Sequence, residues 1–116
     1  MTSVVIAGSR TFNDFTLLEY KCNEILLPYE DITIISGCAK GADRLGELYA
    51  LDKGYTLHRM PAKWSIYGKS AGFIRNEQMA ELCDLAILFW DGRSRGTWDM
   101  YKTCKSLKKQ VKVVPI

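Results

Sequence analysis

The sequence is poor in the residues that build metal centres. It has a single histidine, His58, and no two of its cysteines form a CxxC pair: Cys22, Cys38, Cys83 and Cys104. Because zinc sites are built from cysteine and histidine clusters at short spacings, no metal site is expected. All but Cys38 lie on apolar faces or at the ends of expected helices, so we expect reduced and mostly buried thiols.

Long apolar runs, a basic leader and low-complexity segments are also missing. The first apolar run, Val4–Ala7, is far too short for a signal peptide or a membrane span, so a cytoplasmic protein without membrane contact is expected. The 116 residues, 47% of them hydrophobic, suit one domain over residues 1–116. The net charge of +3 demands no polyanionic partner, and a helix dipole accounts for the lysines near the C-terminal end: Lys105, Lys108, Lys109 and Lys112.

The familiar catalytic and nucleotide signatures are absent as well. The loop after Ala7 lacks the second and third glycines of GxGxxG, and no segment has the P-loop pattern, so both standard sites are disfavoured. No GxSxG elbow occurs, and His58 falls on an expected edge strand, where a structural role is favoured. We therefore assign no catalytic residue and expect no cofactor.

What the sequence does contain is a regular alternation of strand and helix patterns. Four apolar runs are typical of strands buried on both faces: Val4–Ala7, Ile32–Ile35, Leu85–Trp90 and Val111–Val114. Weaker alternation over Tyr55–Met60 predicts an edge strand. Helical spacing fills the intervals: Asp14–Leu27, Ala42–Lys53, Ala71–Cys83 and Thr97–Lys108. This order predicts an α/β fold, a single-domain Rossmann-like three-layer sandwich with a five-stranded parallel sheet (βαβαβαβαβ).

The same patterns predict details of the helices. Asn13 or Asp14 is expected to cap the first helix, and Gly54 to end the second in a left-handed cap. The apolar stripes are expected to place Leu48 of the second helix and Leu82 of the third toward the sheet.

In such a sheet, ligands bind outside the carboxyl ends of the strands, where the strand order reverses. That rule selects three loops: Gly8–Thr11, Ser36–Asp43 and Asp91–Thr97. Each combines glycine, whose backbone N–H groups can approach a ligand closely, with a cation or a hydroxyl, and each precedes a helix. Phosphate is the expected guest.

Acidic and aromatic residues in these regions leave some roles open. The carboxylates of Asp43 and Asp91 are placed either to accept ribose hydroxyls or to cap backbone N–H groups. Among the aromatic residues, Trp64 and Tyr67 lie in an expected long polar loop and are the better candidates to stack on a base.

Five short segments together resemble the YspA-type branch of the SLOG superfamily, named for the Smf/DprA and LOG proteins: Val5–Arg10, Ser36–Asp43, Pro61–Gly72, Arg75–Met79 and Phe89–Thr97. The resemblance spans essentially the whole chain. It implies a Rossmann-like fold that binds nucleotides or nucleotide-derived molecules, including ADP-ribose-type and other NAD-derived signals. It also implies that several of the loop residues line the pocket. With the residues chosen from the loops themselves, the expected ligand-binding set is Gly8, Ser9, Arg10, Thr11, Gly37, Cys38, Ala39, Lys40, Gly41, Asp43, Trp64, Tyr67, Arg75, Asn76, Asp91, Gly92, Ser94, Gly96 and Thr97.

Two departures from the family pattern bear on activity. LOG-type phosphoribohydrolases have a glutamate three residues after a Gly-Thr pair, and Met100 stands there in this chain. Asp99 is one position away. Cys38 stands where the branch usually has glycine, and its thiol would have a lowered pKa only if Lys40 or the helix N-terminus reaches it.

Three functional hypotheses remain. The first is a module that senses or sequesters an ADP-ribose-like or cyclic nucleotide signal, for example as a phage-type sponge. The second is an enzyme that cleaves an N-glycosidic or phosphoester bond of a nucleotide. The third is a DprA-like nucleic-acid binder, for which the lysine cluster near the C-terminal end is the only specific support. Its affinity would fall steeply with added salt. The resemblance also makes a homo-oligomer, a dimer or larger, the expected assembly.

Overall fold

The computed structural model describes residues 1–116 and contains one five-stranded sheet whose strand pairs are all parallel. The strands are β1 (Thr2–Gly8), β2 (Ile32–Ser36), β3 (Thr56–Arg59), β4 (Leu85–Trp90) and β5 (Gln110–Pro115). The helices are α1 (Phe15–Leu26), α2 (Ala42–Lys53), α3 (Trp64–Tyr67), α4 (Ala71–Leu82) and α5 (Arg95–Ser106), with a 3₁₀ turn, η1, at Gly68–Ser70. The Rossmann-like α/β fold expected from the sequence is confirmed.

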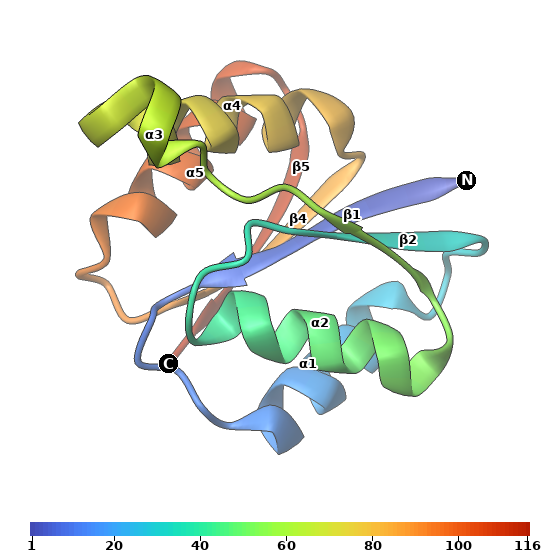
Figure 1. Cartoon of the computed structure of the whole chain (residues 1–116). Coiled ribbons are helices and arrows are strands. Elements are labelled where there is room, and N and C mark those ends of the chain that lie inside the picture. Colours follow the sequence, from blue (N-terminus) through green and yellow to red (C-terminus); the bar gives the residue numbers. More distant parts are fainter.

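The strand order puts the carboxyl ends of β1 and β4 side by side in the middle of the sheet. Helices α1 and α2 cover one face, and α4 and α5 cover the other, with α3 beside α4 (Figure 1). The strand order is β3-β2-β1-β4-β5, so the order reverses between β1 and β4. Parallel α/β sheets open their ligand crevice at this point. None of the helices combines the length and apolar character needed to cross a membrane.

Local signals in the sequence set the helix ends. The carboxylate of Asp14 accepts a hydrogen bond from the Leu17 N–H at 3.0 Å and caps α1. Gly54 ends α2 in the left-handed conformation, with φ of 73°. Both caps were expected. The thiols outside the site are reduced and buried, also as expected: Cys22, Cys83 and Cys104.

Two predicted inward-facing residues are on the surface instead. Leu48 is 47% exposed and Leu82 is 53% exposed. In α2, Gly46 approaches β1 so closely that an added Cβ would lie 2.8 Å from the Ile6 side chain. This contact turns Gly46 and the buried Glu47 toward the sheet and Leu48 away from it. The apolar stripe predicted the wrong orientation because a glycine contact and a partnered carboxylate determine it.

The segment expected to be a long polar loop is also more regular than predicted. Residues 64–67 form the short helix α3, followed by η1, which leads directly into α4. Trp64 and Tyr67 stay largely exposed at 54% and 43%. The prediction failed because a single helical turn has no periodic apolar stripe to signal it.

Candidate ligand-binding site

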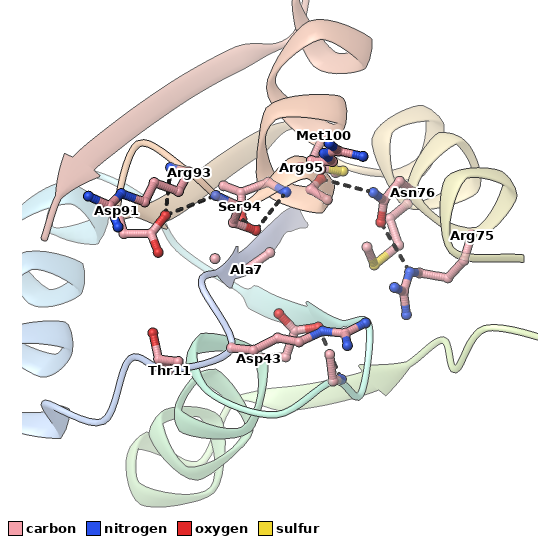
Figure 2. Close-up of a pocket in the computed structure, with 16 residues that line it drawn as sticks. Ala7, Thr11, Asp43, Arg75, Asn76, Asp91, Arg93, Ser94, Arg95 and Met100 are labelled. Carbon is pink, nitrogen blue, oxygen red and sulfur yellow. Dashed lines mark hydrogen bonds between the residues drawn. The ribbon is translucent and has the colours of Figure 1, made fainter. Parts of the chain in front are cut away.

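A cavity of about 490 Å³ opens at the carboxyl ends of β1 and β4, between the first turns of α2 and α5 (Figure 2). Side chains of α4 close one side of it. Of its 16 lining residues, 4 are hydrophobic. The lining residues are Ala7, Gly8, Arg10, Thr11, Ala39, Asp43, Arg75, Asn76, Met79, Asp91, Arg93, Ser94, Arg95, Gly96, Thr97 and Met100. We call this space the main cavity.

Ser9 joins the segments that surround the main cavity. It is buried, and its hydroxyl oxygen accepts a hydrogen bond from the Asp91 N–H at 3.1 Å. Its N–H donates to the Phe89 carbonyl, and its own carbonyl accepts from the Ala42 N–H. The loops after β1 and β4 and the start of α2 therefore meet at one residue, which holds the cavity rim together without lining it.

The main cavity is rich in arginine. Arg10, Arg93 and Arg95 line it, and their side chains make no hydrogen bond or ion pair with the protein. Figure 2 shows Arg75 reaching in from α4 opposite Asp43. A surplus of unpartnered guanidinium groups favours an anionic guest, and phosphate suits their forked geometry.

A hydrogen-bonded chain fixes Arg75 in place. Its guanidinium donates to the Gly37 carbonyl, and its Nε donates to the Asn76 Oδ1 at 3.1 Å. The Asn76 amide nitrogen donates in turn to the Gly96 carbonyl at 3.2 Å and to the Asp99 carboxylate at 3.1 Å. The Asn76 side chain therefore positions Arg75 and the start of α5. Asp99 belongs to the same hydrogen-bonded network and does not line the cavity.

The first turn of α5 faces the cavity with free backbone donors. The Ser94 hydroxyl caps the helix and accepts from the Thr97 N–H at 3.4 Å. The N–H groups of Arg95 and Gly96 precede the first intrahelical bond and stay available to a ligand. The cap uses the Thr97 N–H, so the free backbone donors of this turn are those of Arg95 and Gly96.

The structure distinguishes the two roles left open for Asp91. Its carboxylate accepts hydrogen bonds from the backbone N–H groups of Arg93 and Ser94, at 2.8 and 2.9 Å. These bonds lower its pKa. Asp91 therefore shapes the loop that presents Arg93 and Ser94, in the manner of an Asx turn.

Asp43 is the buried acid of the site. It is 5% exposed, and its carboxylate accepts a hydrogen bond from the Ala39 N–H at 3.2 Å. Burial raises its pKa to about 6, although the Ala39 N–H and the Arg75 charge both oppose the shift. Its carboxylate is therefore easier to protonate in the folded chain than in the unfolded one.

We predict a pH-dependent stability that traces to Asp43. Because the folded pKa lies above the unfolded value of 3.8, the protonated acid stabilises the fold at low pH, and this contribution is lost as pH rises through about 6. Between pH 4.5 and 7.5 the loss should be about 2 kcal/mol. Urea denaturation of the parent chain and of Asp43→Asn at both pH values measures it. The isosteric variant should lack this part of the change, and identical changes in both proteins would contradict the assignment.

A family model and a curated relative match the sequence of this chain. Residues 2–67 match the YspA, cpYpsA-related SLOG family. The chain belongs to this family. It is also 33% identical over 106 residues to the Gene 61 protein of Mycobacterium phage D29, covering 84% of this chain and 83% of that protein.

Solved structures outside that match share the fold with the SLOG chain. DNA processing protein A from Streptococcus pneumoniae superposes with a TM-score of 0.72 at 20% identity, over 99% of this chain and 50% of that one. DNA processing protein A from Helicobacter pylori, which binds single-stranded DNA, gives 0.68 at 19% identity, over 99% of this chain and 66% of that one. The SLOG chain thus spans half to two-thirds of these proteins, and at these identities the likeness shows the fold alone.

The cysteine that departs from the SLOG pattern has a glycine-like backbone. Cys38 adopts φ of 66°, in the left-handed region that disfavours side chains. Its N–H donates to the Ser36 hydroxyl at 3.0 Å, which holds the turn. Burial raises the pKa of its thiol, although Arg59 opposes the shift. The conditional expectation of an activated thiolate is therefore not met.

Beneath this turn the SLOG fold buries a polar cluster that the sequence did not reveal. Glu47 of α2 is 7% exposed. Its carboxylate accepts a hydrogen bond from the Ser36 hydroxyl at 2.7 Å and forms an ion pair with Arg59 at 3.3 Å. Burial raises its pKa, but these two partners outweigh burial and lower it. The partners come from β2 and β3, so no local spacing indicated the cluster.

Most of the expected ligand-binding residues line the main cavity or a second one beside it. The second cavity has a volume of about 400 Å³, and the expected residues that line it and not the main cavity are Gly37, Cys38, Lys40 and Trp64. Those that line neither are Ser9, Gly41, Tyr67 and Gly92. Lining residues that the expected set omitted are Ala7, Pro61, Ala62, Met79, Arg93, Arg95 and Met100. Arg93 and Arg95 could have been included from the sequence, because they lie next to Ser94, which was in the expected set.

Proposed function

We propose that this chain binds a nucleotide-derived small molecule with its phosphate in the main cavity. The observation that carries the proposal is the set of unpartnered arginines, Arg10, Arg93 and Arg95, beside the free N–H groups at the start of α5. A helix N-terminus with guanidinium groups around the same space forms a strong phosphate site. Membership of the SLOG family supports the nucleotide character of the ligand.

Within that class, an ADP-ribose-like or cyclic nucleotide signal is the proposed ligand, bound and released intact. Met100 forms part of the cavity wall where the LOG-type pattern has its glutamate. Asp99, the nearest carboxylate in sequence, is bound to Asn76. The carboxylates that do line the cavity, Asp43 and Asp91, already accept hydrogen bonds from backbone N–H groups, so no free carboxylate takes the place of the LOG-type glutamate.

Arg10→Ala tests the site with little effect on folding, because the Arg10 side chain is exposed and has no partner in the protein. We expect AMP or ADP-ribose to bind more weakly by about 1.5–3 kcal/mol, the usual worth of a charge-assisted hydrogen bond. Calorimetric titration measures the change. Lys105→Ala, on the far end of α5, is the matched control and should leave affinity unaltered.

A larger loss in Lys105→Ala than in Arg10→Ala would contradict the placement of the ligand. Chromatography of the ligand recovered after each titration adds a check on its fate. Free base or ribose phosphate in the supernatant would favour the hydrolase hypothesis.

Single-stranded DNA binding is a second candidate, supported by features away from the main cavity. Trp98 is 44% exposed and stacks between Trp90 and Tyr101, with ring centroids 5.7 and 5.6 Å apart. Lys102 and Lys105 lie over the Trp98 and Tyr101 rings. Aromatic rings with lysines are typical of single-strand binding surfaces. Oligonucleotide binding that falls steeply with salt and is lost in Lys105→Ala would favour this candidate.

A further inference from the structure

The second cavity opens beside the main cavity and shares part of its wall. Arg10, Ala39 and Arg75 line both. The second cavity lies between the turn after β2 and the segment that leads into α3, with Pro61 and Ala62 on its apolar side. Both volumes, about 490 and 400 Å³, fall within the range of small-molecule pockets.

The positive side chains where the two cavities meet favour binding of an anion. Arg10 and Arg75 stand at the shared wall, and Lys40 lines the second cavity, whose lining contains no carboxylate. The Nε and one terminal nitrogen of Arg75 donate hydrogen bonds to Asn76 and Gly37. The side chains of Arg10 and Lys40 have no partner in the protein. Burial lowers the pKa of Arg75 and the Arg10 charge adds to this shift, whereas the Asp43 carboxylate opposes it. Two guanidinium groups that repel each other are stabilised by an anion placed between them.

Trp64 gives the second cavity an aromatic wall close to this junction. Its six-membered ring lies against the backbone of Gly72, where an added Cβ would be 3.5 Å from the ring and 4.0 Å from the Arg75 guanidinium. Gly72 precedes Arg75 by one helical turn in α4. The indole therefore stands beside the arginine and is half exposed with no ring stacked on it.

We infer that the ligand consists of two units joined by a diphosphate, with one unit in each cavity, the linker at Arg10 and Arg75, and the second unit against Trp64. This inference rests on the proposed function, because it assumes that the main cavity holds a phosphorylated nucleoside unit. The second unit is a base or a sugar, as in a dinucleotide or a nucleoside diphosphate sugar. A nucleoside monophosphate fills the main cavity alone and never reaches Trp64.

Calorimetric titration of the parent chain and Trp64→Ala with AMP, ADP-ribose and NAD tests the inference. The parent should bind ADP-ribose or NAD at least about tenfold more tightly than AMP. Trp64→Ala should bring that ligand to within about threefold of AMP while leaving AMP itself unchanged. Ile66→Ala is the matched control, since Ile66 lies in the same short helix, is 67% exposed and lines neither cavity.

The outcomes separate the two proposals. If AMP binds but ADP-ribose and NAD bind no more tightly, or if Trp64→Ala weakens all three equally, the two-unit ligand is wrong and the phosphate site stands. If none of the three binds, the proposed function fails and the inference fails with it. The preference of the parent between ADP-ribose and NAD identifies the second unit as a sugar or a base.

Discussion

Replacing Gly96 with valine is expected to abolish binding of a phosphorylated ligand while leaving the fold intact. Gly96 lines the main cavity, and a Cβ added there meets no protein atom within 4 Å. The valine side chain would therefore extend into the space beside the free N–H groups of α5, where phosphate is proposed to sit. Valine is no worse a helix residue than glycine, so α5 should persist. Titration with AMP or ADP-ribose should show a loss of at least about 1,000-fold, or about 4 kcal/mol.

Gly54→Val provides the opposite result as a control. Gly54 also has open space around it, but its φ of 73° disfavours any side chain. This variant should lose stability by at least about 1 kcal/mol while the folded fraction binds with parental affinity. Retention of affinity within twofold in Gly96→Val would show that the ligand does not approach Gly96.

Gly8→Ala is expected to destabilise the whole domain by more than about 4 kcal/mol, which is large for a single added methyl group. Gly8 is the last residue of β1 and pairs with Phe89 of β4. Its φ is 155°, and a Cβ there would collide with the Phe89 carbonyl group. Backbone cannot move aside as a flexible side chain can, so the two central strands would separate. Urea denaturation measures the loss.

Gly92→Ala separates this collision from ordinary backbone strain. Gly92 also has a positive φ, of 81°, but no atom lies within 4 Å of an added Cβ. It should cost only about 1 kcal/mol, the price of a left-handed alanine. Equal losses in the two variants would mean that the close approach of β1 and β4 adds nothing.

The sheet was predictable because buried parallel strands have a strong local signature. Leu85–Trp90 is continuously apolar, and it forms a central strand with the expected bounds. Charge and glycine after the strands likewise located the main cavity. These signals are local, so they can be recognised without knowledge of the partners that each side chain finds in the fold.

The features that were missed depend on contacts between distant segments. Leu48 was expected inside because it continues an apolar stripe, but Gly46 against Ile6 sets the rotation of α2. Asn76 lines the main cavity, and its amide also joins Arg75 to Gly96. No spacing within α4 indicates a carbonyl of α5 as a partner. The site could be located from sequence, but its division into contacting and positioning residues required the fold.

The junction at Ser9 has a consequence for how ligand binding is coupled to unfolding. Three of its hydrogen-bond partners, Ala42, Phe89 and Asp91, lie far from it in sequence, and the hydrogen bonds to them close the cavity rim. A partly unfolded chain that has released β4 or α2 has no rim and therefore no affinity. On the proposed function, ligand binds only the complete domain, so its full binding energy opposes every opening of these strands. The amide hydrogens of β1 and β4 should accordingly exchange with solvent more slowly as ligand is added, including those far from the cavity.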